Sequence, residues 1–529
     1  MSNNDNVENQ ALLVETSEDE TLETVDNGRR WRYDEVINLI GVGRFHLLLL
    51  FLCGWANAAD SVEVTCVSLI LPSLHCDLGA SSVQLGWLTA VIFIGMLVGG
   101  YAWGSAGDSL GRKRVLVASL FVNGLFGLLS SFAPTFWTFF ACRFFSGVGV
   151  GGSIPVIWSY YSEFQPAKSR GRMLSLLATF WMVGQMLTAG LAWLVIPSNA
   201  AFFSLPLIGG VFSSWRLFVA VATLLCLSSS FFVMRFLPES PKYLLEKGRS
   251  SEALEVLRKL WRRNTGKSLS EFPVHSLSPE GDGGSCGVSC NERSLGLLRR
   301  TLTQSSLLFR PSLFRSTLYL LVINFSLSFG SYGLTLWLPE LFARSRYDDD
   351  DTASFSVCQR RDGVGERISQ AGQSSCSAPP DAVVFRDSFL LSISSLPGNL
   401  FTIVLLDSLG RKPIFVIGAA LSATSAFLVP LVSSRTEVLL VSCIFAGVSV
   451  VCWNCLDAFG AELFPTSLRA TALGLSLALA RAGAVLGTVA FGWLIDAHCV
   501  VPIMLAAVMM AVAAVTSLLL KETTGSTLR

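Results

Sequence analysis

Twelve apolar stretches run through this chain of 529 residues, and each is close to the length that a helix needs to cross a bilayer. A spanning helix requires roughly 20 apolar residues. The stretches lie at about 45–72, 84–106, 115–133, 137–162, 173–197, 214–237, 314–341, 386–406, 413–432, 437–461, 470–495 and 499–520. Only 15% of the residues are charged, whereas soluble globular chains carry roughly 25%. The sequence therefore predicts an all-α membrane protein with twelve transmembrane helices.

Basic residues gather in the connections on one side of these helices. They are Arg112, Lys113, Arg114, Lys168, Arg170, Arg172, Arg411, Lys412 and Arg469, and the long segment 238–313 on the same side is also basic. The short connections on the other side, near 73–83, 134–136 and 198–213, contain no Lys or Arg. By the positive-inside rule, this asymmetry predicts that both termini are cytoplasmic. The basic residues of the outer loop 342–385 depart from the pattern, but long loops obey the rule poorly.

Two motifs occur twice at the same spacing. Residues Asp108 to Lys113, with the sequence DSLGRK, recur letter for letter as Asp407 to Lys412, 299 residues later. The pattern ExxPxxxR starts at Glu163 and again at Glu462, with the same offset. Two motifs at one offset indicate a duplicated six-helix unit. Parallel repeats of six helices are the architecture of major facilitator transporters, which bind their substrate near the bilayer midplane between the halves.

The repeat divides the chain into five parts. They are an acidic cytoplasmic tail (1–43), a six-helix half (44–237), a cytoplasmic linker with short amphipathic helices (238–313), a second six-helix half (314–520) that includes the outer loop 342–385, and a short tail (521–529). The amphipathic linker helices are expected to lie on the membrane surface.

The repeated motifs predict a cytoplasmic gate. Its candidate residues are Gly104, Asp108, Gly111, Arg112, Lys113, Glu163, Arg170, Asp407, Gly410, Arg411, Glu462 and Arg469. Charge pairs in these loops can hold the cytoplasmic face shut and must break when it opens. The alternative is that the basic residues only retain the loops in the cytoplasm, but this leaves the repeated acids unexplained.

The charged residues inside the apolar stretches include Asp60, Glu63, Arg143, Asp457 and Arg481. Each costs at least about 2.5 kcal/mol at the bilayer centre unless it is paired or faces water. One hypothesis is that Asp60 or Glu63 binds a coupling proton or a cationic group. The other is a structural ion pair, for instance with Arg143 or Arg481. Asp457 and Arg481 could equally form a mutual pair that lines the cavity.

Other chemistry finds little support in the residues. No catalytic triad, phosphate-binding loop or metal-binding set is present, so neither an enzyme nor a cofactor is predicted. The net charge of +1 gives no indication of nucleic acid binding. Cys358 and Cys376 lie in the predicted outer loop, on an oxidising side of the membrane, where they could form a disulfide.

Three segments carry a family resemblance. They are Gly151 to Phe164 (GGSIPVIWSYYSEF), Asp60 to Glu63 (DSVE) and Pro238 to Leu245 (PESPKYLL). Over about 35–520 the chain resembles the synaptic-vesicle-glycoprotein-2-like branch of the major facilitator superfamily, which is related to the organic ion transporters. The resemblance implies a membrane transporter or transporter-like protein of vesicles, with family acids at Asp60 and Glu63. The family's loop signature would map to Gly104, Asp108, Gly111, Arg112 and Lys113.

The chain departs from this family in the outer loop. The vesicle glycoproteins carry a large glycosylated luminal domain between helices 7 and 8, whereas 342–385 is short and has no glycosylation sequon. Luminal partner recognition is therefore not carried over. At the N-terminus, Glu8 to Leu13 resembles an acidic dileucine signal, which would let sorting adaptors bind through Leu12 and Leu13.

Two functions remain as hypotheses. The first is a secondary transporter that moves a small polar or charged organic solute by alternating access, with proton coupling as a further option. The second is a non-transporting scaffold or regulatory protein of vesicle membranes that retains the fold. A vesicle membrane is the favoured location, and the plasma membrane is the alternative.

Overall fold

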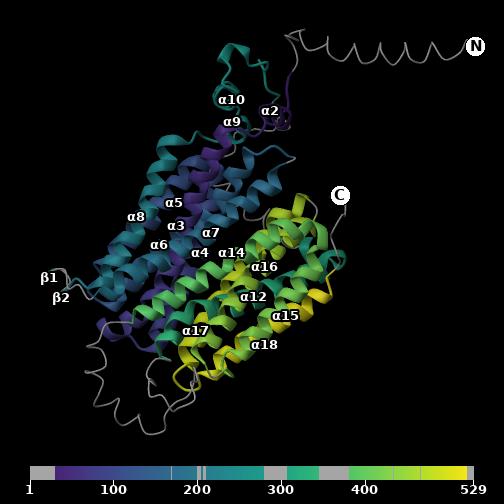
Figure 1. Ribbon diagram of the computed structural model, residues 1–529. Helices are drawn as coiled ribbons and strands as arrows, with labels where there is room; N and C mark the ends of the chain where they lie inside the picture. The colour runs from purple at the N-terminus through teal and green to yellow at the C-terminus, as the bar shows by residue number, and fades with distance from the viewer. Residues whose placement is uncertain are drawn as a thin grey trace, which may run out of the picture.

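The computed structural model describes residues 30–167, 169–198, 204–205, 210–278, 307–344, 381–432, 434–464 and 466–520. The helices of the first half are α3 (Arg44–Asp77), α4 (Ser82–Leu110), α5 (Arg112–Ser131), α6 (Phe136–Glu163), α7 (Arg170–Val195) and α8 (Ser214–Phe236). Those of the second half are α12 (Pro311–Arg344), α14 (Ala382–Leu409), α15 (Arg411–Leu428), α16 (Arg435–Glu462), α17 (Thr466–Leu494) and α18 (Val500–Leu518). The halves lie side by side, one purple to teal and the other teal-green to yellow (Figure 1).

Eleven of the described helices are long and apolar enough to cross a membrane. The prediction of an all-helical membrane protein is therefore confirmed. The predicted stretch 413–432 corresponds to α15, which is not among the eleven because Arg411 and Lys412 in its first turn lower its mean hydropathy. A twelfth span and the cytoplasmic position of the termini stay predictions.

Helix ends follow local capping rules. Ser81 begins α4 as a capping box, because its hydroxyl accepts from the backbone N–H of Gln84 and the Gln84 side chain accepts from the N–H of Ser81. Gly111 joins α4 to α5 with a φ of 105°, and Gly410 joins α14 to α15 with a φ of 90°. These values favour glycine, which has no Cβ. The two copies of the repeated motif thus make the same turn.

Helix packing repeats between the halves. The pairs α4–α6, α5–α6, α3–α7, α5–α8 and α3–α8 pack in the first half, and α14–α16, α15–α16, α12–α17, α15–α18 and α12–α18 pack in the second. The helices correspond in chain order, α3 to α12, α4 to α14, α5 to α15, α6 to α16, α7 to α17 and α8 to α18. Exchanging each helix for its counterpart converts one set of pairs into the other. The principal contacts between the halves, α4–α17 and α7–α14, are also exchanged by this operation, and α3–α12 is left unchanged. The structure therefore has the internal symmetry that the repeat indicated.

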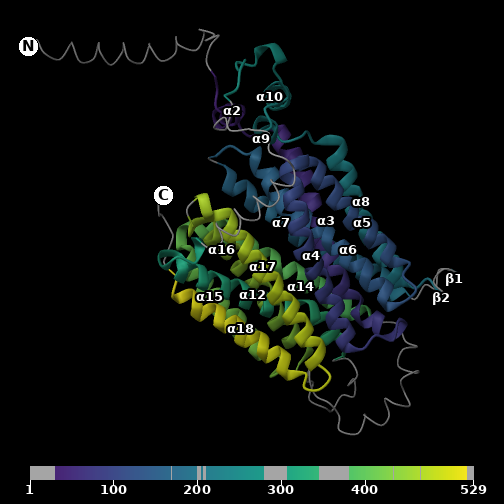
Figure 2. The ribbon, with the colours of Figure 1, turned by 180° about the vertical axis from the view of Figure 1, so that it is seen from behind.

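Short elements cap one end of the first half. They are α2 (Tyr33–Ile40), α9 (Pro241–Glu246), α10 (Ser250–Thr265) and the 3-10 helix η3 (Leu269–Glu271), and α2, α9 and α10 lie beyond that end in both views (Figures 1 and 2). We call this end of the molecule, where the DSLGRK turns also lie, the basic end. Ile196–Ser198 (η1) and a two-stranded pair, β1 (Ser204–Leu205) with β2 (Gly210–Val211), lie at the opposite end.

The linker contains two short helices, α9 and α10. The apolar face of α10 was expected to lie on the membrane surface, but it packs against protein instead. Ala253, Leu257 and Leu260 of α10 are buried in a cluster with Val36 of α2 and Phe45 of α3. Because α2 supplies an apolar partner, this face is covered by protein rather than by lipid. We call α2, α9, α10 and the segment 272–278 the basic-end module. The backbone of Trp31 pairs with that of Leu277, which ties the tail to the linker.

Candidate functional site

Asp60 lies at the centre of the first half, where α3, α5 and α6 meet, and has no solvent exposure. The Ser153 hydroxyl donates to its Oδ2 at 2.6 Å, and the Asn123 amide donates to its Oδ1 at 3.2 Å. Both donors are neutral. The carboxylate is thus held by hydrogen bonds without a direct cationic partner.

Glu63 lies one turn further along α3 and is equally buried. Its Oε1 accepts from Nη1 of Arg143 and from the hydroxyl of Ser146, both on α6. The guanidinium of Arg143 also lies 4.9 Å from the ring centroid of Phe139. Of the two partners that the sequence left open for these acids, the structure therefore brings Arg143 to Glu63. The pair lies within one half and away from the contact between the halves.

Asp457 and Arg481 lie in the second half, on α16 and α17. Asp457 is exposed to the space between the helices or to the surface of the protein. Arg481 extends toward the other half, because its guanidinium lies 5.8 Å from the ring centroid of Phe93 on α4. Arg481 therefore lies at the seam between the halves, unlike Asp60 and Glu63.

An aromatic row crosses this seam. The ring of Phe93 on α4 lies 4.9 Å from that of Tyr332 on α12, which lies 5.6 Å from that of Trp453 on α16. The Trp453 indole donates to the hydroxyl of Ser331 at 3.2 Å. The row therefore offers ring faces beside the positive charge of Arg481.

Amide groups form a second contact across the seam. Asn399 on α14 donates to the hydroxyl of Thr179 on α7 at 2.9 Å, and its carbonyl accepts from Asn454 on α16 at 2.9 Å. These three residues were not predicted from the sequence. A single Asn or Thr in an apolar helix gives little signal, because such side chains often bond within their own helix, as Thr89 does. We call the aromatic row, Arg481 and these amides the seam layer.

The gate residues of the first half contact one another at the basic end. Arg112 Nε lies 3.5 Å from an Oε1 of Glu163, and Glu239 accepts from the backbone N–H of Lys113 at 2.8 Å. A Cβ on Gly111 would lie 2.6 Å from the Glu239 carboxylate. These contacts all stay within the first half and the linker.

The other predicted gate residues are less closely connected. Arg170 pairs with Asp34 of α2 at 3.8 Å. A Cβ added to Gly104 would meet no atom within 4 Å. In the second half, Lys412 donates at 2.8 Å to the carbonyl of Leu518, which ends α18, and at 2.7 Å to that of Leu520 just beyond it. Arg411 begins α15 after Gly410. The side chains of Asp108, Asp407, Glu462 and Arg469 lie outside the described part of the chain.

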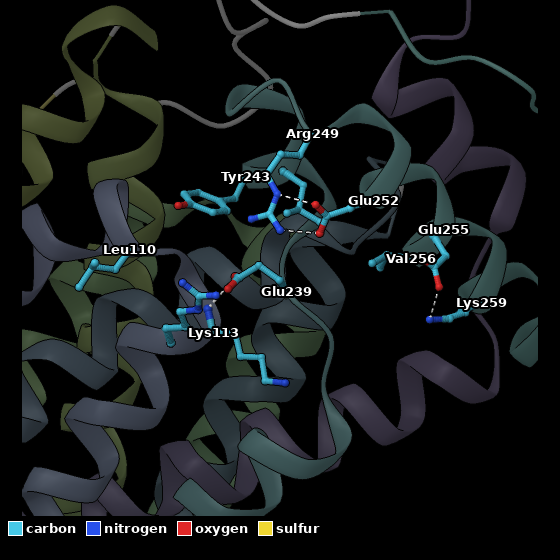
Figure 3. Close-up of a pocket in the computed structure, with 11 residues that line it drawn as sticks. Leu110, Lys113, Glu239, Tyr243, Arg249, Glu252, Glu255, Val256 and Lys259 are labelled. Carbon is cyan, nitrogen blue, oxygen red and sulfur yellow. Dashed lines mark hydrogen bonds and ion pairs between the residues drawn. The ribbon is translucent and has the colours of Figure 1, made fainter. Parts of the chain in front are cut away.

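A pocket of about 430 Å³ opens at the basic end (Figure 3). Lys113 and Glu239 line it, together with two ion pairs of α10, Arg249–Glu252 at 2.5 Å and Lys259–Glu255 at 2.6 Å. All its lining residues belong to the first half or to the linker. This pocket is therefore separate from the seam layer.

The predicted disulfide between Cys358 and Cys376 lies outside the described residues. At the opposite end, Cys76 and Cys499 are both disulfide-bonded. The described residues contain no group of His, Cys, Asp and Glu that could hold a metal ion. Leu12 and Leu13 also fall outside the described ranges.

Residues 16–279 match the family described as "Sugar (and other) transporter", and residues 388–528 match "Major Facilitator Superfamily". Synaptic vesicle glycoprotein 2C of Rattus norvegicus is 30% identical over 93% of this chain and 80% of its own length. Synaptic vesicle glycoprotein 2A of Bos taurus is 30% identical over 94% and 80%.

Solved structures share the fold at lower identity. A partially occluded inward-open xylose transporter XylE from E. coli superimposes with a TM-score of 0.65 at 17% identity, over 91% of this chain and 99% of XylE. These matches place the chain with multi-pass membrane proteins of a transporter fold and not with enzymes. The two repeated halves, the buried acids of α3 and these relatives together show that the chain belongs to the synaptic vesicle glycoprotein 2 branch of the major facilitator superfamily.

Proposed function

We propose that this protein is a secondary transporter of a vesicle membrane that moves a small polar or charged organic solute by alternating access. The solute would bind at the seam layer, and the two halves would rock around it. The basic end would face the cytoplasm, in accord with the positive-inside pattern. The names of the relatives support the vesicle location, and the sugar-transporter family supports a small organic solute.

The seam layer is the observation that carries this proposal. Polar side chains inside a membrane are expensive and usually mark a solute or ion pathway. Here Asn399 and Asn454 lie near the contact between the halves, and so do Arg481 and Trp453. Amides both donate and accept hydrogen bonds, and an aromatic face packs against a sugar ring or a cation. The chemistry suits a solute with hydroxyl groups, a charge, or both.

The contacts between the halves support a state that is open toward the basic end. At the opposite end, Gly86 of α4 and Gly492 of α17 approach so closely that a Cβ on Gly86 would lie 2.9 Å from the Cα of Gly492. Toward the basic end, a Cβ on Gly104 of α4 or on Gly474 of α17 would meet no atom within 4 Å. A transporter in this state would exchange solute with the cytoplasm.

Asp60 is the better candidate for a coupling proton. Protonating Glu63 would leave the cation of Arg143 buried without its partner, which is strongly unfavourable. Protonating Asp60 would leave no charge unpaired, because its partners, Ser153 and Asn123, are neutral. An acid held by neutral donors can therefore gain and lose a proton with less disturbance of the core.

Uptake into proteoliposomes would test the proposal. A panel of sugars, organic cations and organic anions would be offered with and without a pH gradient. The wild type would be compared with Asp60→Asn and with Glu255→Gln, which alters an exposed carboxylate of α10.

We expect gradient-dependent uptake that is lost in Asp60→Asn and kept in Glu255→Gln. Uptake that ignores both the gradient and Asp60→Asn would indicate facilitated diffusion and reject the coupling role. No uptake of any compound by folded protein would reject transport and favour the scaffold hypothesis.

A further inference from the structure

Arg344 ends α12 at the opposite end of the molecule and has three partners on three elements. Its Nε donates to Glu340 on the same helix at 2.9 Å. Nη1 donates to Asp496, which follows α17, at 2.8 Å, and Nη2 donates to the hydroxyl of Ser82 at 2.8 Å. Glu340 and Asp496 belong to the second half, whereas Ser82 begins α4 in the first half.

Ser82 is therefore held across the contact between the halves. It is buried, and its hydroxyl also hydrogen-bonds to the carboxylate of Asp496. A Cβ added to Gly492 would lie 2.6 Å from the backbone carbonyl oxygen of Ser82. The side-chain bonds thus occur at the place where the backbones of α4 and α17 are closest.

We propose that Arg344 and Asp496 form a latch that grips Ser82 and holds the opposite end of the transporter closed. The latch must release Ser82 each time the seam opens toward that side. It rests on the proposed alternating access and adds the residues that set the balance between the two open states.

The arrangement of charges makes this latch reversible. When α4 moves away, Arg344 keeps both of its carboxylate partners, because Glu340 and Asp496 move with the second half. Release therefore breaks hydrogen bonds to a hydroxyl but strands no ion. A salt bridge across the halves would instead leave two unpaired charges on opening.

The latch differs from the other arginine cluster at this end. Arg435 donates two hydrogen bonds to Asp387, at 3.1 and 2.9 Å, and Arg386 donates to the same carboxylate. All three belong to the second half. This cluster should move as one body when the halves rock, so it offers a matched control.

Hydrogen–deuterium exchange of the full-length protein in lipid nanodiscs would test the latch without any solute. Three variants would be compared with the wild type: Arg344→Gln, Ser82→Ala and Arg435→Gln. Peptides covering 82–95 and 484–498 report on the opposite end, and peptides covering 100–112 report on the basic end.

In Arg344→Gln and Ser82→Ala we expect faster exchange at 82–95 and 484–498, and slower exchange at 100–112. Loss of one charge-assisted hydrogen bond should shift the opening equilibrium by about tenfold. Arg435→Gln should leave these peptides as in the wild type. Ser82→Ala keeps both ion pairs of Arg344. Its exchange therefore tests the latch even if Arg344→Gln does not fold.

Unchanged exchange in Ser82→Ala, or the same change in Arg435→Gln, would overturn the latch. The readout does not depend on transport. A shift in exchange without uptake of any compound would support the latch and reject the proposed function. Uptake without a shift in exchange would support the proposed function and reject the latch.

Discussion

The carboxylates of Asp60 and Glu63, on one face of α3, have different kinds of partner. Glu63 has a cation beside it, whereas Asp60 has only neutral donors. Removing one member of a buried ion pair leaves an uncompensated charge, which typically costs about 3–5 kcal/mol of stability. Removing a carboxylate that is held by neutral donors leaves no such charge.

Glu63→Gln should therefore lower the free energy of unfolding by about 3–5 kcal/mol, and Asp60→Asn by about 1 kcal/mol. Thermal unfolding in detergent, followed by intrinsic tryptophan fluorescence, would measure both changes. The double variant Glu63→Gln/Arg143→Gln should recover part of the loss, because the stranded cation is also removed. Equal effects of the two single variants would contradict this account of the pair.

Gly111 is constrained by both its backbone and its surroundings. Gly111→Ala should cost about 1–3 kcal/mol of stability, because the residue has a φ of 105° and its new Cβ would meet the Glu239 carboxylate. Gly104→Ala is the control, since nothing lies within 4 Å of the added atom. Denaturant unfolding of both variants would compare them. A neutral Gly111→Ala would show that this turn tolerates a side chain.

Sequence reasoning identified the charges in the helices but not all of their neighbours. A carboxylate in an apolar stretch is costly, so Asp60 and Glu63 stand out, and their spacing places them on one face. The choice between Arg143 and Arg481 depends on tertiary packing, which spacing does not encode. Asn399 was not predicted because a neutral amide in an apolar helix has many possible partners.

At the scale of helices, α4 and α17 pack closely against each other at one end of the seam. Their backbones approach at Gly86 and Gly492, where a Cβ would meet backbone atoms that cannot rotate away. Close approach of this kind depends on small residues, as is common between membrane helices.

Gly492→Leu should hold the opposite end open, because the new side chain would overlap the backbones of Ser82 and Gly86. Single-particle cryo-EM in nanodiscs would show the separation of α4 from α17 directly. Gly474→Leu is the matched control in α17, where an added Cβ has no neighbour within 4 Å. A closed opposite end in Gly492→Leu would mean that the helices can slide past the added side chain.

Most helices could be located from the sequence because lipid imposes a minimum length on each apolar stretch. The exceptions have local causes. α15 begins with two basic residues, and the partner of α10 is supplied by α2, a short helix within the predicted tail. The strands β1 and β2 are only two residues long and carry no alternating pattern that would predict them.

At the scale of the whole molecule, the motif repeat predicted a symmetry that the helix contacts display. The site does not follow this symmetry. Asp60, Glu63 and Arg143 occur only in the first half, whereas Asp457 and Arg481 occur only in the second. In the proposed mechanism, this difference in charge between the halves would separate a solute position at the seam from a proton position within one half.

Acid at the opposite end of the molecule should not open the latch. Burial alone would raise the pKa of Asp496, but hydrogen bonds from Arg344 and Ser82 and the charges of Arg344 and His75 outweigh it and hold the pKa below its usual value. The stabilisation by this carboxylate is therefore present above about pH 3.9 and is lost only as the pH falls through the lowered pKa. Glu340 is the other charged group at Arg344.

Exchange at 82–95, corrected for the intrinsic chemical rate, should thus be the same at pH 5.5 and pH 7.5 in His75→Gln protein, which has no histidine charge beside Asp496, because about pH 5.5 is still well above the usual aspartate value of about 3.9. Faster corrected exchange at the lower pH would contradict the ionised state of Asp496. Asp496→Asn would serve as the control, since it should raise exchange equally at both values.

The basic-end module packs on one half only. Asn264 at the end of α10 accepts from the backbone N–H of Phe45 at 3.0 Å and donates to the carbonyl of Gly41 at 3.1 Å. An antibody fragment bound to the outer face of α10 would therefore travel with the first half as a rigid mass. It would give electron microscopy a fixed landmark for aligning small particles and leave the second half free to swing, so that one such reagent could image every conformation.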